Sequence, residues 1–176
     1  MTADLDGYLR MVDVGGDSFD VFYARQRKPL IALAYAVTGS RSGAEDLAQD
    51  ALTAAYRSWD EIRVKDNPGI WVRRILLNRA SSAYRRRLAE VRALARRPRD
   101  FESVAFPDVT GEIDKIWLEV RRLPRRQTEV IALAYLEAMT MTEIASVLQV
   151  TKQTVDVHIR RARQKLADRL GLEESL

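Results

Sequence analysis

The sequence predicts an all-α protein built of two small helical domains joined by a flexible linker, with a helix-turn-helix at the end of the second domain. Apolar residues recur at steps of three and four along most of the chain, with no sustained period-two alternation. Helix-capping residues precede several of these stretches. An arginine-rich, proline-containing stretch separates two helical halves, so we expect domains at 15–87 and 112–172 and a linker at 88–111.

The first helix of the N-terminal domain can be capped by Asp17 or Ser18. We expect it to bend near Pro29 and to end at Gly39, because proline removes a backbone donor and glycine tolerates the left-handed cap conformation.

Two further helices are expected in this domain. A second helix should begin at Ser42, which has capping-box spacing to Glu45, and it combines an alanine- and leucine-rich face with an acidic face. Residues 59–66 are expected to form a loop. Asn67-Pro68 then offers a cap followed by proline at the first helical position, and the third helix should run to about Arg87.

The linker prediction rests on residues 97–100 and 106–108, where prolines interrupt an arginine-rich sequence. Its basic run fits either a solvated surface or a contact along nucleic acid. After the linker, residues 113–123 and 124–136 predict two more helices, which complete a four-helix module together with the helix-turn-helix.

The helix-turn-helix is expected at residues 141–166. Thr140 and Glu143 have capping-box spacing, Gln149-Val150 is a break, and Thr151 can cap the second helix. In that helix a buried stripe is predicted at Val155, Ile159, Ala162, Leu166 and Leu170. The opposite face, with Gln153, Val157, Arg160 and Gln164 outward and Asp156 and Arg161 at its flanks, suits the major groove of DNA.

A plainer interpretation of this segment is an amphipathic hairpin with a solvated basic face. Asp156 lies four residues before Arg160, so the two can form an ion pair on the helix surface instead of contacting bases.

The amino-acid composition indicates which kinds of partner and site the chain can have. The chain has 176 residues, 47% of them hydrophobic, and a net charge of +4, which fits a polyanionic partner. With no cysteine and a single histidine, His158, neither a zinc site nor a Ser-His triad is expected, and we predict no cofactor and no metal. A signal peptide and a membrane span are both lacking, so a cytoplasmic protein without membrane insertion is expected.

Three segments together carry a family resemblance: residues 44–59, 67–87 and 123–166. In order and spacing they resemble the extracytoplasmic-function group of bacterial RNA polymerase sigma factors, over about 18–170 of the chain. The resemblance implies a non-catalytic promoter-specificity subunit that binds core RNA polymerase and promoter DNA and helps to melt the DNA. It also admits an anti-sigma factor as a regulatory partner.

The resemblance assigns roles to three groups of residues. The second helix would dock on the polymerase through Asp46, Gln49 and Asp50, although their residue types alone indicate no more than a soluble helix face. The minus-ten element would be recognised by the 59–65 segment and the third helix, with candidate DNA contacts at Arg63, Lys65, Arg73, Arg74, Asn78, Arg79, Arg85 and Arg86. Asn78 is the best candidate for a base contact, Trp71 fits the core better than a stacking role, and Trp59 fits either.

The minus-thirty-five element would be bound by the last helix. Its candidate contacts are Lys152, Gln153, Thr154, Asp156, Val157, His158, Arg160, Arg161 and Arg163. At 153–158 the chain departs from the usual sigma pattern and looks more like LuxR-type regulators, which leaves the preferred promoter sequence open.

Two other classes of protein fit the sequence less well. A LuxR-type response regulator needs an α/β phosphoacceptor domain, and the N-terminal half has no strand pattern to build one. A helical enzyme needs a catalytic site. Asp46 and Asp50 lie on one helix face, as a pair of metal-binding carboxylates would, but the sequence places no histidine or second carboxylate-bearing helix to complete such a site.

Overall fold

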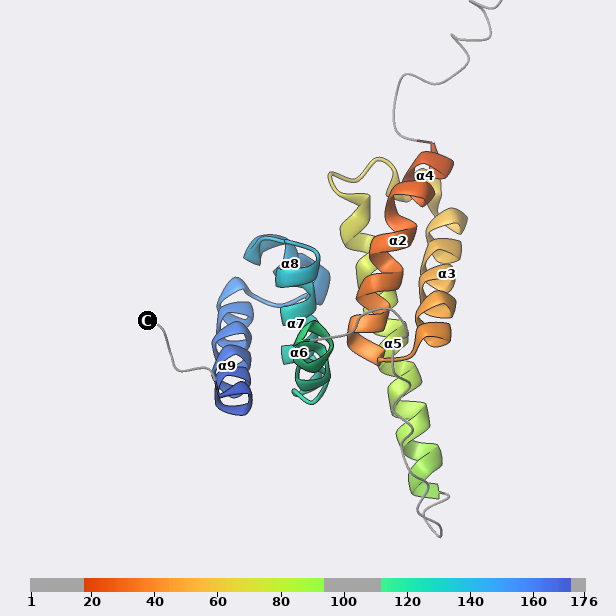
Figure 1. The fold of residues 1–176 in the computed structure, drawn as a ribbon. Coiled ribbons are helices and arrows are strands. Elements are labelled where there is room, and N and C mark those ends of the chain that lie inside the picture. Colours follow the sequence, from red (N-terminus) through yellow and green to blue (C-terminus); the bar gives the residue numbers. More distant parts are fainter. Residues whose placement is uncertain (1–17, 94–111, 172–176) are drawn as a thin grey trace, which may run out of the picture.

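The computed structural model describes residues 18–93 and 112–171, with side chains described at 18–83 and 115–171. All regular elements in these ranges are helical, which confirms the predicted fold class. In chain order they are α2 (Phe19–Thr38), α3 (Arg41–Arg57), α4 (Trp59–Ile62), α5 (Pro68–Ala93), α6 (Glu112–Arg121), α7 (Arg125–Ile131), the π-helical turn η1 (Ala132–Leu136), α8 (Met141–Leu148) and α9 (Lys152–Leu170). Figure 1 shows α2 to α5 on one side and α6 to α9 on the other.

Local signals define both ends of α2. The Ser18 side chain accepts a hydrogen bond from the Val21 N–H at 3.4 Å, and Gly39 ends the helix with φ of +71°. Pro29 lies inside the helix. Asp17, the alternative cap, lies outside the described residues.

The predicted start of α3 at Ser42 is wrong. The cap is Ser40, whose Oγ accepts from the Gly43 N–H at 3.2 Å, and the helix begins at Arg41. Because α2 ends in the left-handed Gly39, the next residue enters an extended conformation and becomes the cap (φ −113°, ψ 121°), which leaves Ser42 inside the first turn.

Two further boundaries differ from the prediction. Residues 59–66 are not wholly a loop, because α4 forms one helical turn at their start. The α5 helix begins at Pro68 as predicted but continues to Ala93, past the expected end at Arg87 and into the predicted linker. Residues 88–93 (Leu-Ala-Glu-Val-Arg-Ala) are mostly good helix formers, and no proline occurs until 98. The remainder of the linker, 94–111, lies outside the described residues.

The helix-turn-helix forms as its capping signals predict. Thr140 and Glu143 make both bonds of a capping box at the start of α8, and the Thr151 Oγ1 accepts from the Thr154 N–H at 3.1 Å at the start of α9. Between them Gln149 adopts a left-handed conformation with φ of +55°, which ends α8 and turns the chain.

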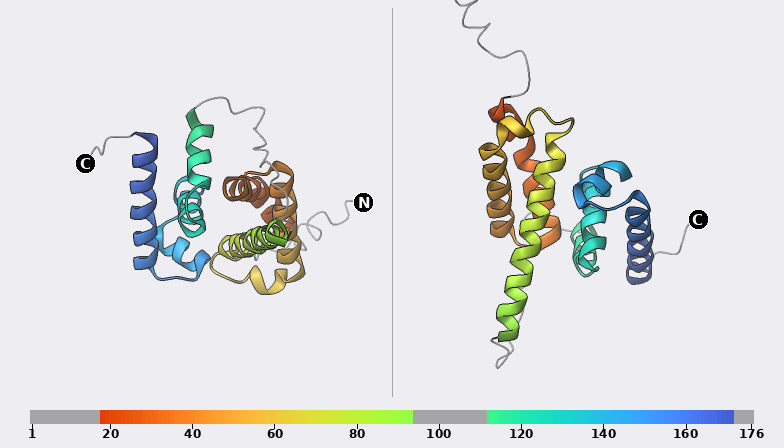
Figure 2. Two further views of the ribbon diagram at one scale, coloured as in Figure 1. Left: turned by 90° about the horizontal axis from the view of Figure 1, so that it is seen from below. Right: turned by 180° about the vertical axis from the view of Figure 1, so that it is seen from behind.

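One hydrophobic core crosses the boundary between the two halves. Its buried members include Leu30, Leu33 and Leu76 from the N-terminal half together with Leu133 and Ile144 from the C-terminal half. The α2 helix packs against α6, α7 and η1, while α5 packs against α8. The two halves therefore lie side by side, with α9 at the outer edge (Figure 2).

Candidate nucleic-acid interface

The α9 helix presents a basic face to solvent. Val155 and Ala162 are fully buried on its inner side, and Ile159, Leu166 and Leu170 are half-buried. Five of the predicted DNA contacts are exposed on the outer side of α9: Lys152, Gln153, Arg160, Arg161 and Arg163. Because α9 is the helix farthest from the N-terminal half (Figure 1), nothing in the described chain covers this face.

The other predicted contacts on α9 are half-buried: Thr154, Asp156, Val157 and His158. The Thr154 hydroxyl lies 2.9 Å from the Thr151 hydroxyl and so belongs to the helix cap. The Nδ1 atom of His158 is buried and has no hydrogen-bond partner among the described residues, so this ring is turned partly inward.

Two of the exposed arginines are held by neighbours on the protein. Arg160 Nη2 lies 2.9 Å from Asp156 Oδ2, so the two residues form the ion pair on the helix surface that their spacing in the sequence allows. Arg163 Nε donates to the Tyr135 hydroxyl at 2.6 Å, with its guanidinium carbon 5.6 Å from the centre of that ring. Both arginines remain exposed, so these contacts orient the guanidinium groups without covering them.

On the N-terminal half, four predicted DNA contacts are exposed: Arg63, Lys65, Asn78 and Arg79. Arg63 Nε pairs with Asp60 at 3.2 Å, within the α4 turn and the residue that follows it. Arg79 Nη1 pairs with Asp50 Oδ2 at 2.9 Å and thereby joins α5 to α3. The side chains of Arg85 and Arg86 lie outside the described residues.

Arg73 and Arg74 are not free for DNA in this arrangement. Arg73 Nε donates to Glu137 Oε2 at 2.8 Å, and Nη2 contacts the same oxygen. Arg73 Nη1 also donates to Gln26 Oε1 at 2.8 Å and to the Gly69 carbonyl at 3.1 Å. Only 11% of the Arg73 side chain and 5% of the Glu137 side chain are exposed. The neighbouring Arg74 donates to the Ser146 carbonyl of α8 at 2.6 Å, so both arginines bind the C-terminal half.

The two tryptophans of interest belong to packing clusters. Trp71 is half-buried against the core, as the sequence favoured. The Trp59 ring lies 4.8 Å from Phe22 and 5.4 Å from Phe19, measured between ring centres, in an aromatic group that joins α2 to α4. Trp59 therefore serves the fold of the 59–66 segment.

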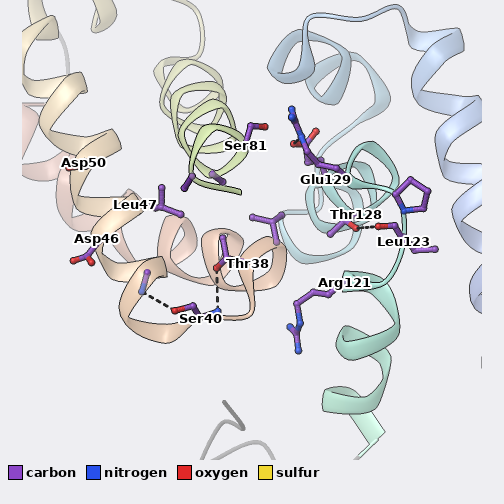
Figure 3. A pocket seen from close by; sticks show the side chains of 16 residues that line it. Thr38, Ser40, Asp46, Leu47, Asp50, Ser81, Arg121, Leu123, Thr128 and Glu129 are labelled. Atoms are coloured by element: carbon purple, nitrogen blue, oxygen red, sulfur yellow. Dashed lines mark hydrogen bonds and ion pairs between the residues drawn. The ribbon is translucent and has the colours of Figure 1, made fainter. Parts of the chain in front are cut away.

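The acidic face of α3 carries Asp46, Gln49 and Asp50, and all three side chains are exposed. Gln49 Oε1 accepts a bond from the Tyr23 hydroxyl at 3.3 Å, and Asp50 holds Arg79 as described above. Asp46 and Asp50 also border a cavity of about 680 Å³ whose opposite wall is formed by residues of the C-terminal half, including Arg121 and Leu123 (Figure 3).

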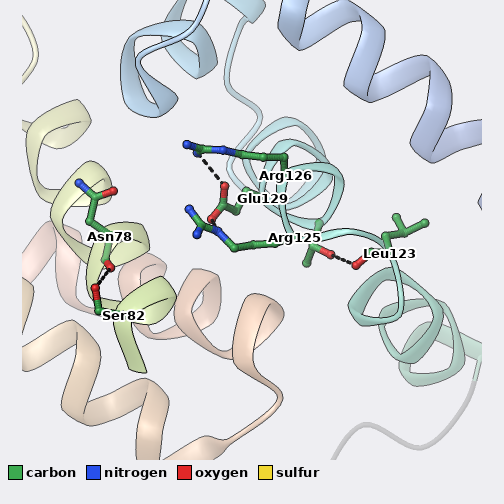
Figure 4. Close-up of polar contacts among 7 residues, drawn as sticks. Asn78, Ser82, Leu123, Arg125, Arg126 and Glu129 are labelled. Carbon is green, nitrogen blue, oxygen red and sulfur yellow. Dashed lines mark hydrogen bonds and ion pairs between the residues drawn. The ribbon is translucent and has the colours of Figure 1, made fainter. Parts of the chain in front are cut away.

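A charge cluster lies on the α7 side of this cavity. Glu129, nearly fully buried, receives a bond from Arg125 Nε at 2.7 Å and one from Arg126 Nη1 at 3.0 Å. Figure 4 shows both arginines directed toward α5, with the Glu129 carboxylate between them. Thr128 closes the turn before α7 by donating to the Val120 carbonyl at 2.8 Å.

The capping box of α8 alters one titration. The backbone N–H of Thr140 donates to Glu143 Oε2 at 2.8 Å, and the Thr140 hydroxyl lies at the same distance from that oxygen. The two bonds, with the backbone bond the larger influence, hold the pKa of Glu143 below its usual range because they stabilise the carboxylate.

Sequence reasoning missed the contacts that join the two halves, above all the one between Arg73 and Glu137. Among residues 18–83 and 115–171, no three histidine or acidic side chains lie close enough to hold a metal ion. None of the helices in the described part of the chain is long and apolar enough to cross a membrane.

Comparison with known families assigns both halves. Residues 22–90 match the model for Sigma-70 region 2, and residues 113–166 match that for Sigma-70, region 4. Together the two matches cover most of the chain and coincide with the two groups of helices.

Individual relatives and structures agree. The chain is 28% identical over 171 residues to the ECF RNA polymerase sigma factor SigM of Mycobacterium tuberculosis, covering 94% of this chain and 85% of the relative. It is 24% identical over 180 residues to SigW of Bacillus subtilis, covering 95% and 90%. The fold resembles the sigma factor RpoE in complex with the anti-sigma factor NepR from Bartonella quintana (TM-score 0.77, 22% identity, 89% and 98% covered). It also resembles CnrH in complex with the cytosolic domain of CnrY (TM-score 0.63, 26% identity, 89% of each chain).

Proposed function

The chain belongs to the extracytoplasmic-function (ECF) sigma factors of bacterial RNA polymerase, and we propose which of its residues carry out the work of that family. It is a non-catalytic subunit that directs transcription initiation together with core polymerase and promoter DNA. The proposal concerns three surfaces, the control of the protein and its location.

The polymerase-docking surface is the acidic face of α3, defined by Asp46, Gln49 and Asp50. Support comes from their shared exposure on one helix and from the charge, since carboxylates form short, strong bonds with basic partner residues. Asp50 already forms such a bond with Arg79. A basic residue of the polymerase would compete with that arginine.

The minus-ten surface combines the turn after α4 with the basic side of α5. Asn78 offers an exposed amide that can pair with the edge of an unstacked base, and Arg63, Lys65 and Arg79 supply exposed positive charge on the same half of the protein. Arg73 and Arg74 join this surface only after they leave Glu137 and the Ser146 carbonyl. Arg85 and Arg86 extend the proposed set along α5.

The minus-thirty-five surface is the outer face of α9. We assign base contacts to Gln153 and Arg160, because glutamine suits adenine and arginine suits guanine in the major groove. Lys152, Arg161 and Arg163 suit phosphates. Asp156 orients Arg160 through their ion pair. This role would also explain why an acidic residue occurs on a surface that we propose to bind DNA.

Regulation by an anti-sigma factor is part of the proposal. Both structural relatives named above were solved with an anti-sigma factor or with the cytosolic domain of a second protein bound. The cavity between the two halves, bordered by the docking residues Asp46 and Asp50, offers such a partner a place to cover that surface. Since polymerase and promoter DNA are cytoplasmic, we also place this chain in the cytoplasm.

The observation that carries the proposal is the joint occurrence of both sigma regions on one chain, with the DNA-facing side of α9 exposed. The test is to mix the purified chain with core polymerase and promoter fragments. A stable complex that starts transcription at defined sites is the expected result. A chain that binds duplex DNA alone without binding the polymerase would instead be a separate regulator, and a chain that binds neither would refute both assignments.

A further inference from the structure

We propose that Tyr135 and Arg163 form a phosphate clamp, in which the tyrosine hydroxyl and the guanidinium group bind one phosphate of the minus-thirty-five DNA. Tyr135 belongs to η1 and lies outside the three proposed binding surfaces, whereas Arg163 belongs to the outer face of α9. The inference rests on the proposed function, because it adds a contact to the same DNA-binding surface.

The two side chains of the clamp are already joined in the free chain. Arg163 Nε donates to the Tyr135 hydroxyl oxygen at 2.6 Å, and the guanidinium carbon lies 5.6 Å from the centre of the ring. Both residues nevertheless remain open to solvent, with Tyr135 56% exposed. Because the ring and the hydrogen bond hold the arginine in place, less side-chain freedom is lost when it binds a partner.

The hydrogen-bond donors that remain on the clamp suit an anion. A tyrosine hydroxyl carries one proton, and the Tyr135 oxygen already accepts from Arg163 Nε, so this proton is left to donate. Among the described residues, neither that proton nor the two Nη groups of Arg163 has a hydrogen-bond partner. The pair therefore presents a hydroxyl and two charged NH₂ groups side by side. Tyrosine and arginine side chains with free donors are typical contacts of DNA phosphates.

The position of Arg163 on α9 fits a phosphate better than a base. At about 100° per residue, Arg163 lies at the edge of the outward face, on the same side as Asp156. It also lies about 15 Å along the helix from Gln153. The major groove is about 12 Å wide, so a helix whose first turn contacts bases carries Arg163 to the rim of the groove, where the phosphates are.

Helix packing holds the two halves of the clamp together. The α7 helix packs against α9, and Ile131 of α7 shares a buried cluster with Ala162 of α9. Tyr135 follows Ile131 by one turn, and Arg163 directly follows Ala162. The clamp therefore continues the α7–α9 contact to the protein surface, and the buried cluster fixes the separation of the two backbones.

Two unusual backbone conformations occur beside Tyr135. The η1 turn is π-helical, and the Glu137 N–H donates to the Ala132 carbonyl at 3.3 Å. Ala138 then adopts φ of +49°, in the left-handed region that is unfavourable for a residue with a Cβ atom. Such turns and such strained residues occur often at functional sites. A DNA contact at Tyr135 gives this segment a function that its unfavourable backbone would serve.

The test scans the DNA phosphates one at a time. Holoenzyme is reconstituted from core polymerase and the full chain, and it is bound to promoter duplexes in which single phosphates of the minus-thirty-five element are replaced by uncharged methylphosphonates. Tyr135→Phe removes only the hydroxyl and should bind the unmodified promoter about three- to tenfold more weakly, which is the effect of one hydrogen bond. One and the same replacement should cost Tyr135→Phe and Arg163→Ala much less affinity than it costs the unchanged chain.

The two side chains should also be coupled, because each positions the other. The loss of affinity in the Tyr135→Phe, Arg163→Ala double variant should be smaller than the product of the two single losses. Two control variants should keep the methylphosphonate profile of the unchanged chain. Tyr56→Phe removes the same atom from an exposed tyrosine of α3, and Arg169→Ala removes an exposed arginine that pairs with Glu119 on another side of α9.

Three results would overturn the clamp: wild-type affinity in Tyr135→Phe, loss of sensitivity at different phosphates in the two single variants, or losses that simply multiply. A lower melting temperature of Tyr135→Phe with an unaltered methylphosphonate profile would also overturn it, since the pair would then only fasten η1 to α9.

The outcome can be separated from that of the proposed function. Holoenzyme that starts transcription but shows no shared phosphate refutes the clamp alone. If the chain does not bind the polymerase, the proposed function is refuted, and the same scan with the full chain on duplex DNA decides the clamp. Binding to neither would overturn both.

Discussion

The polymerase-docking role of α3 is most sharply tested by Asp50→Arg. Asp50 is well exposed, with 61% of its side chain accessible, and its one described ion pair is with the half-exposed Arg79. An exposed pair of this kind contributes about 0.2–1 kcal/mol, so its loss should lower the melting temperature by only a few degrees. The helix itself should form unchanged.

The effect on binding should be far larger. Removing one partner of a hydrogen-bonded charge pair that the interface buries costs about 2–5 kcal/mol, which is a loss of about 30-fold or more in affinity, and the reversed charge adds repulsion. Fluorescence anisotropy of the labelled chain, titrated with core polymerase at two salt concentrations, measures this loss. The matched control is Asp168→Arg, which makes the same charge change at an exposed position of α9. If Asp50→Arg bound within twofold of the unchanged chain, α3 would not be the docking helix.

Four further predictions concern α9 and α8. Gln153→Ala should change the preferred bases of the minus-thirty-five element in a randomised promoter pool, and an unaltered preference would show that α9 is rotated from the proposed orientation. Arg161→Ala should weaken binding similarly on all sequences and reduce the slope of log affinity against log salt by about one, whereas a sequence-dependent loss would make it a base contact. For the capping box, Thr140→Ala should cost about 1 kcal/mol of unfolding free energy. Because the pKa of Glu143 is lower in the folded chain than in the unfolded chain, its carboxylate stabilises the fold at pH values above the unfolded pKa of about 4.3. This stabilisation is lost as the pH falls through the folded pKa. The difference in unfolding free energy between the unchanged chain and Glu143→Gln should therefore be largest at neutral pH and should decrease in acid. A difference that stays constant down to pH 3 would show that the Glu143 carboxylate does not stabilise the helix cap.

Features set by a few neighbouring residues could be predicted from the sequence. The capping box of Thr140 and Glu143, the Thr151 cap and the end of α2 at Gly39 each depend on residues at most four positions apart. Buried positions of α9 followed from the helical repeat, and Val155 and Ala162 are fully buried. These signals were enough to predict two helical modules and most of the exposed face of α9.

Local ambiguity explains the wrong boundaries. Ser40 and Ser42 are both good caps, and the choice between them depends on how the preceding helix ends at Gly39. The one-turn helix α4 is too short to carry a repeat of its own, and it is held in place by Trp59 packing on Phe22. Neither feature can be derived from the residues of the segment alone.

The contacts between the halves lay beyond sequence reasoning for a different reason. Arg73 and Glu137 are 64 positions apart, and an arginine on a basic helix is most simply interpreted as a DNA contact. Arg74 binds a backbone carbonyl, which has no signature in the sequence. The sequence therefore predicted both domains but not their closure onto each other.

The measurement that tests the central claim most directly is genome-wide mapping of transcription starts after induced expression of this chain, with Asp50→Arg expressed as the control. We predict a set of new starts that share two upstream elements at a fixed spacing, and the loss of these starts with Asp50→Arg. New starts that share only one element, or no new starts at all, would contradict the assignment of two promoter-binding surfaces to α5 and α9.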